Sequence, residues 1–116
     1  MTAEAAQEAP DVMLSMFLVN SSPATVLFDS GASHSFIAQS FVKKYDIPMI
    51  AMKNSMIVSS PGAEMQATLR CPLVNITLRG VEFLVSLVVL KTYGIDVILG
   101  MEWLKQRKAV IPKQFS

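Results

Sequence analysis

The fold is decided by one stretch of sequence, Val26-Leu27-Phe28-Asp29-Ser30-Gly31-Ala32-Ser33. Its leading apolar residues predict a buried strand, and a carboxylate stands where that strand ends. The next two residues, Ser30 and Gly31, predict a turn because both residue types favour turns. Such a turn would hold the Asp29 carboxylate at the mouth of the core, beside a hydroxyl and exposed backbone amides. That arrangement suits chemistry on a water molecule.

Length and composition limit the classes of protein to which the chain can belong. With 116 residues it is expected to form one domain. Hydrophobic residues make up 52% and charged residues only 16%, and the mean hydropathy is +0.44. Such surplus apolar surface in a small domain indicates burial against a partner. The net charge is +1 and the ten Lys and Arg are scattered, so we expect no binding to nucleic acid.

Targeting, membrane and metal patterns are not found in the sequence. The apolar runs, such as Leu87-Val88-Val89-Leu90, are far shorter than a bilayer span. Residues 1–10 lack the basic start and apolar core of a signal peptide, so a cytoplasmic location is expected, without membrane contact. Cys71 is the single cysteine and is expected to be a small buried hydrophobe. His34 stands alone, and the sequence therefore predicts neither a metal nor a cofactor.

Short apolar runs that alternate with turn formers predict a mainly β protein. Residues 1–11 are expected to be a disordered leader, 12–111 the folded domain and 112–116 a tail. Turns are predicted at Asn20–Pro23, around Pro61-Gly62 and at Arg79-Gly80. Strands are predicted over residues 12–19, 24–28, 56–58, 65–69, 73–78, 81–90, 95–100 and 109–111.

Two short helices are also expected. Phe36, Ile37, Phe41, Val42 and Tyr45 recur at roughly helical spacing after Gly31. Ser33 is a plausible N-cap for this helix, Lys43 and Lys44 suit its last turn, and Pro48 blocks its continuation. The second helix is predicted over residues 101–105, where Trp103 is expected to anchor the core.

The chain contains a short internal repeat. An apolar strand, a Gly turn and a helix occur around Val26–Gly31 and again around Val97–Gly100. The sequence therefore predicts two related halves, of which only the first carries the Asp-Ser-Gly triplet. Asp96 precedes the second strand and is interpreted as a turn or cap residue, not as a second catalytic group.

A carboxylate at this place suggests amide hydrolysis, which needs two carboxylates within a few ångströms that share one proton. Because the sequence has one Asp-Ser-Gly, the second Asp29 would come from another copy across a two-fold axis. Ser30 would then bond the facing loop, Gly31 would donate its N–H to Asp29, and Ala32 would line a groove. The Ser59–Glu64 hairpin would fold over that groove and close on an extended peptide.

The motifs Phe28-Asp29-Ser30-Gly31-Ala32-Ser33-His34-Ser35-Phe36-Ile37 and Asp96-Val97-Ile98-Leu99-Gly100-Met101-Glu102-Trp103-Leu104 resemble a retropepsin-type aspartic protease. The similarity runs from about Val12 to Ile111 and is greatest to the protease segment of plant Ty3/gypsy-type retrotransposon polyproteins. It implies an acid protease fold, closed-barrel-like with one or two short helices, that acts as a homodimer.

The resemblance also assigns roles to individual positions. It implies that Asp29 is the catalytic aspartate, supported by Ser30, Gly31 and Ala32. It places Ile98, Leu99 and Gly100 in the glycine element of the second half. Ser59, Ser60, Pro61 and Gly62 correspond, more loosely, to the flap that covers the substrate. Residues 112–116 are expected to end before a further strand that family members usually have.

Two functions remain open on the sequence. The first is a homodimeric aspartic endopeptidase that cleaves a retroelement polyprotein in extended, apolar segments. The second is a catalytically inactive, protease-like module for dimerisation or peptide binding. A peptidase should lose activity when Asp29 is replaced, whereas a binding module should be indifferent to that change.

Overall fold

Alternating apolar residues place most of this chain in strands, as the sequence predicts. The computed structural model describes residues 12–29, 31–60, 63–100 and 103. Its elements, in chain order, are β1 (Val12–Val19), β2 (Ser22–Asp29), β3 (Phe36–Ala38), α2 (Gln39–Lys44), β4 (Ile50–Ser60), β5 (Ala63–Leu78), β6 (Val81–Leu90) and β7 (Val97–Leu99). The prediction of a mainly β protein is therefore confirmed.

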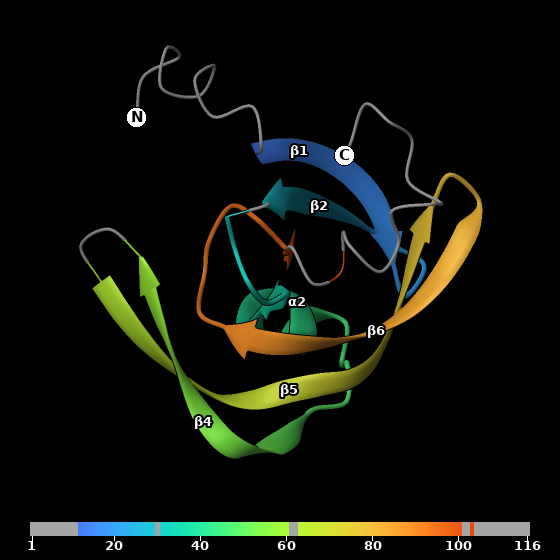
Figure 1. The fold of residues 1–116 in the computed structure, drawn as a ribbon. Helices are drawn as coiled ribbons and strands as arrows, with labels where there is room; N and C mark the ends of the chain where they lie inside the picture. The colour runs from blue at the N-terminus through green and yellow to red at the C-terminus, as the bar shows by residue number, and fades with distance from the viewer. Residues whose placement is uncertain (1–11, 30, 61–62, 101–102, 104–116) are drawn as a thin grey trace.

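The strands close into a ring (Figure 1). Their order is β1-β2-β7-β3-β6-β5-β4, and β1 also pairs with β5 through Leu18↔Thr77 and Val19↔Ile76. This extra pairing joins the two ends of the series from β1 to β5, while β4 pairs with the outer edge of β5. The closed arrangement expected from the sequence is thus present as a ring of strands.

Tight turns connect the two strands in each of two hairpins, β1–β2 and β5–β6. Asn20 and Ser21 link β1 to β2 with φ of 49° and 69°, and Arg79 and Gly80 link β5 to β6 with φ of 52° and 79°. Positive φ at both central residues matches the right-handed twist of the flanking strands. The predicted turn at Asn20–Pro23 is therefore too long, because β2 begins at Ser22.

Asn20 binds the first hairpin to the neighbouring strand β5. Its backbone N–H donates to the Asn75 carbonyl at 2.7 Å, and its Oδ1 accepts the Asn75 N–H at 2.8 Å. Asn20 thus forms the turn and holds β5 at the same time. The register of the ring at β1 and β5 is fixed by these bonds and by the adjacent strand pairs.

The helix predicted directly after Gly31 is wrong in its first part. Phe36–Ala38 forms β3, which pairs with both β6 and β7, and α2 begins only at Gln39. A buried three-residue strand has no clear period, so the apolar pattern alone cannot distinguish it from a helix. The N-cap is Ala38 without a side-chain bond, and Ser33 is not the cap. Lys43 and Lys44 do lie in the last turn.

Other strands are longer or shorter than predicted. The runs expected at 65–69 and 73–78 are one strand, β5, whose pairing with β6 is interrupted by an irregularity between Cys71 and Val74. The predicted strand at 56–58 extends over Ile50–Ser60, and the strand at 95–100 shrinks to Val97–Leu99. The expected leader, the strand at 109–111, the tail and most of the second helix lie outside the described residues.

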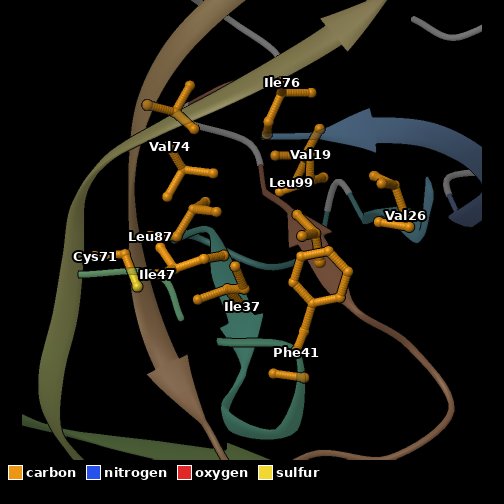
Figure 2. Packing of buried hydrophobic residues seen from close by; sticks show 14 of the residues in the cluster. Val19, Val26, Ile37, Phe41, Ile47, Cys71, Val74, Ile76, Leu87 and Leu99 are labelled. Atoms are coloured by element: carbon orange, nitrogen blue, oxygen red, sulfur yellow. The ribbon is translucent and has the colours of Figure 1, made fainter. Parts of the chain in front are cut away.

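The main core fills the inside of the ring (Figure 2). Figure 2 shows Val19 and Val26 from the first hairpin facing Ile76, Leu87 and Leu99. Cys71 is fully buried in this cluster and Trp103 is 3% exposed, so both are core residues as predicted. Each fully buried large apolar side chain stabilises the fold by about 1.5–3 kcal/mol.

A second, smaller cluster joins the β4–β5 hairpin to the rest of the molecule. We refer to it as the hairpin cluster. Its buried members are Phe36, Ala67 and Leu90, and the partly buried residues packed on them are Met52, Met56, Val58, Met65, Val88 and Ile98. Several methionines in this set agree with their predicted role as adaptable packing.

Candidate active site

Asp29 is the last residue of β2, where the sequence predicts the strand to end. Ala24, Val26 and Phe28 alternate into the core, whereas Thr25, Leu27 and Asp29 are half-buried on the other face. The alternation therefore turns the carboxylate away from the main core. Its strand is held on one side by β1 and on the other by β7.

The loop after Asp29 is organised around that residue. The Gly31 N–H donates to Asp29 Oδ1 at 2.9 Å, and the Ala32 N–H donates to the Asp29 carbonyl at 3.1 Å. A Cβ on Gly31 would lie 3.2 Å from Asp29 Oδ1, so a larger residue would crowd the carboxylate. Gly31 thus makes the contact that the sequence predicts. Ser30 lies outside the described residues.

The glycine element of the second half lies beside Asp29. β7 runs parallel to β2 with Val26↔Val97 and Phe28↔Leu99 as pairs, so the two strands of the internal repeat are direct neighbours. β7 is also antiparallel to β3. It therefore lies between the strand that enters the Asp29 loop and the strand that leaves it. Leu99 faces the main core and Ile98 faces the hairpin cluster.

Gly100 fits tightly against the Asp29 loop. Its N–H donates to Ser35 Oγ at 3.0 Å, in a buried position. A Cβ at this position would lie 2.7 Å from the Ala32 carbonyl oxygen and nearer still to that of His34. Both obstacles are backbone atoms that cannot rotate away. Only glycine therefore allows β7 to end this close to the loop.

The predicted flap corresponds to the end of the β4–β5 hairpin. Ser59 and Ser60 belong to β4, and Ser59 Oγ lies 3.5 Å from Glu64 Oε2 across the hairpin. Pro61 and Gly62 lie outside the described residues. In Figure 1 the hairpin projects beyond β6, and the hairpin cluster packs it against the rest of the molecule. The structure thus connects the hairpin to β3 and β7, which flank the Asp29 loop.

Two polar residues that hold β7 in place were not identified from the sequence. Ser35 is 3% exposed and accepts the Gly100 N–H, and Thr25 bonds to Asp96. Serine and threonine are common in loops and strands, so neither position gives a signal until the strand order is known. The pairing of β7 between β2 and β3 brings Thr25 to Asp96 and Ser35 to Gly100.

Asp96 does not face Asp29. Its Oδ2 accepts the Thr25 N–H at 2.8 Å, and Thr25 is four residues before Asp29 on an extended strand, or about 13 Å at 3.3 Å per residue. The two carboxylates therefore cannot share a proton within one chain. The interpretation of Asp96 as a structural residue agrees with this geometry.

His34 and Cys71 are the other reactive side chains that the sequence singles out. His34 is exposed and its Nδ1 lies 3.0 Å from Ser33 Oγ. Burial raises the pKa of the Cys71 thiol above its ordinary value. Across the part of the chain that is described, no three or more His, Cys, Asp or Glu side chains are grouped to hold a metal ion. The same part has no helix long and apolar enough to span a bilayer.

Comparison with known proteins adds to this geometry. The sequence profile of the retroviral aspartyl protease family matches residues 1–114. Among solved structures 259 chains are similar to this one. EIAV protease complexed with the inhibitor HBY-793 is 19% identical, with a TM-score of 0.67 over 87% of this chain and 92% of that one.

A second similar structure is the retroviral protease-like domain of Ddi1 from Leishmania major. It is 16% identical, with a TM-score of 0.63 over 84% of this chain and 73% of that one. At such identities the likeness of the two structures shows the fold alone. No curated protein matches the sequence.

Proposed function

Because this chain belongs to the retroviral aspartyl protease family, we propose that it is an aspartic endopeptidase whose active unit is a homodimer. The observation that carries the proposal is the placement of Asp29. It ends a half-buried strand, its Oδ1 accepts the Gly31 N–H, and the tightly packed Gly100 turn lies against its loop. A carboxylate held in this way is preorganised for its reaction.

The second carboxylate is proposed to be Asp29 of the partner subunit. Asp96 is bonded to Thr25, which lies about 13 Å from Asp29 along β2, so Asp96 does not supply it. In the dimer, one carboxylate would take a proton from water while the other donates a proton to the scissile carbonyl. Ser30 is proposed to hold the two loops in register. Ala32 would line the groove.

An extended, largely apolar peptide is the proposed substrate. The hairpin would cover it, with Ser59, Ser60, Pro61 and Gly62 at the covering end. Met56 and Met65 of the hairpin and Ile98 of β7 are partly buried and offer apolar surface between the hairpin and the site strands. We propose that the natural substrate is a polyprotein of a Ty3/gypsy-type retroelement, cleaved in the cytoplasm, and that residues 12–111 form the protease domain.

The direct test compares wild type with Asp29→Asn in a cleavage assay on apolar peptide substrates over acidic to neutral pH. Asp29→Asn should keep the thermal stability of wild type and lose activity by at least about a hundredfold. Asp46→Asn is the matched control, because Asp46 is exposed, follows α2 with φ of 53°, and Asn tolerates that conformation. Full activity in Asp29→Asn would refute the assignment.

The alternative function is a non-catalytic dimerisation or peptide-binding module. The observation that favours it is that Asp96, bonded to Thr25, does not supply a second carboxylate beside Asp29. If wild type binds peptides as tightly as Asp29→Asn and cleaves none of them, the module is the better description. If binding is equal but only wild type cleaves, the endopeptidase stands.

A further inference from the structure

Asp96 uses its side chain and its backbone to hold two strands. Its Oδ2 accepts the Thr25 N–H at 2.8 Å, and its own N–H donates to the Thr25 carbonyl at 2.9 Å. Its carbonyl accepts the Ala38 N–H at 2.8 Å. Thr25 belongs to β2 and Ala38 ends β3. Asp96 therefore joins both neighbours of β7 one residue before β7 begins.

The strands that Asp96 joins are the two arms of the Asp29 loop. β2 leads into Asp29, and β3 begins directly after Ser35. β7 lies between these arms and spans only Val97–Leu99. At its other end, Gly100 is bonded to Ser35 and packed against the loop carbonyls. β7 is thus fastened to the arms at both ends.

The bonds at the two ends of β7 are important because a strand of three residues has few ladder hydrogen bonds to fix its register. A slip by one residue turns every side chain of a strand to the opposite face. In β7 that slip would move Ile98 from the hairpin cluster to the core and remove Val97 and Leu99 from the core. It would also carry Gly100 away from the Asp29 loop.

We propose that Asp96 is a positioning residue for Asp29, acting through the bond from the Thr25 N–H to its carboxylate. This bond sets the register of β7, and β7 in turn sets the distance between the arms of the loop. The catalytic part of this inference rests on the proposed endopeptidase function. The structural part, that Asp96 controls the geometry at Gly31 although Thr25 lies about 13 Å along β2 from Asp29, does not.

The test uses full-length wild type with the variants Asp96→Ala, Asp96→Asn and Glu82→Ala. Asn keeps an acceptor oxygen at the same place, whereas Ala removes it. Glu82→Ala is the matched control, because its carboxylate also accepts an N–H, from Asn75 Nδ2 at 3.2 Å, but on β6. Amide hydrogen exchange and amide chemical shifts by NMR report on Thr25 and Gly31, and peptide cleavage reports kcat and KM.

In wild type the Thr25 amide should exchange at least about tenfold more slowly than in an unstructured peptide. Asp96→Ala should remove that protection, shift the Gly31 amide signal, and lower kcat by at least about tenfold with little change in KM. Asp96→Asn and Glu82→Ala should leave the Gly31 signal and kcat near wild type. An unprotected Thr25 amide in wild type would overturn the proposal even if Asp96→Ala does not fold.

Three further outcomes bear on this inference and on the proposed function. A loss of kcat in Asp96→Asn as large as in Asp96→Ala would overturn the positioning role, because Asn retains the acceptor. A wild type that cleaves nothing would refute the endopeptidase, yet the Gly31 shift in Asp96→Ala would still support the role of Asp96. An unchanged Gly31 signal in a folded Asp96→Ala protein would refute it.

Discussion

Replacing Gly100 with alanine should destabilise the protein through a steric clash at the Asp29 loop. The added Cβ would lie 2.7 Å from the Ala32 carbonyl oxygen and still nearer to that of His34. Because both atoms are backbone, relief requires β7 or the loop to move. That movement would stretch the bond from the Gly100 N–H to Ser35 Oγ, which is 3.0 Å long and buried.

The expected cost follows from these contacts. Overpacking costs about 1–3 kcal/mol, and an unpaired buried N–H costs about 1–3 kcal/mol more. The loss of glycine from the unfolded chain returns about 0.4–1 kcal/mol. With the middle of each range, the free energy of unfolding should fall by about 3 kcal/mol. At about 4 °C per kcal/mol for a domain of this size, Tm should fall by about 12 °C.

Urea denaturation and thermal unfolding of Gly100→Ala measure this cost, with Gly94→Ala as the control. Gly94 has φ of +83° and nothing within 4 Å of an added Cβ, so its replacement should cost about 1–2 kcal/mol from backbone strain alone. The two variants separate a glycine that is required by close contacts, Gly100, from one that is required by its positive φ, Gly94. If Gly100→Ala is no more destabilising than Gly94→Ala, the tight contact between β7 and the Asp29 loop is refuted.

Three other perturbations test the same account. Ser35→Ala removes the hydroxyl that accepts the buried Gly100 N–H and should lower the free energy of unfolding by about 1–3 kcal/mol, measured by urea denaturation; Ser35→Thr, which keeps the hydroxyl, should lose less. Burial raises the pKa of the Cys71 thiol, so the folded state holds this proton more firmly than the unfolded state. The protonated Cys71 thiol should therefore contribute fully to the free energy of unfolding below the ordinary thiol pKa of about 8.5, and less as pH rises above it. Cys71→Ala should abolish the part of the alkaline loss of stability that this thiol causes. Trp103→Ala should cost about 3–5 kcal/mol, because Trp103 packs against Phe28 at 6.1 Å between ring centroids; an unchanged Tm would contradict its role as a core anchor.

Much of the fold follows from local chemistry in the sequence. β1 and β6 have the bounds that alternation and turn residues predict, and Arg79-Gly80 forms the expected tight turn. Asp29 lies at the end of its strand, as predicted, and Val26 and Phe28 alternate into the core ahead of it. These features depend on neighbours in the chain, which a sequence displays directly.

The errors lie where distant segments decide the structure. Phe36–Ala38 is a strand because it fills the space between β6 and β7, and no local period reveals that pairing. The roles of Ser35 and Thr25 likewise depend on β7 lying between β2 and β3. Gly100 was expected from its motif, but its clash with the Asp29 loop becomes visible only when the two segments meet.

The measurement that tests the central claim most directly is specific activity and sedimentation of wild type over the same range of concentrations. The account predicts that cleavage per chain rises in proportion to the fraction of dimer, since each chain supplies one Asp29 to a shared site. Asp29→Asn chains added in excess should suppress the activity by forming mixed dimers. An active species that remains monomeric at every concentration, or a stable dimer without cleavage at any acidic or neutral pH, would contradict the account.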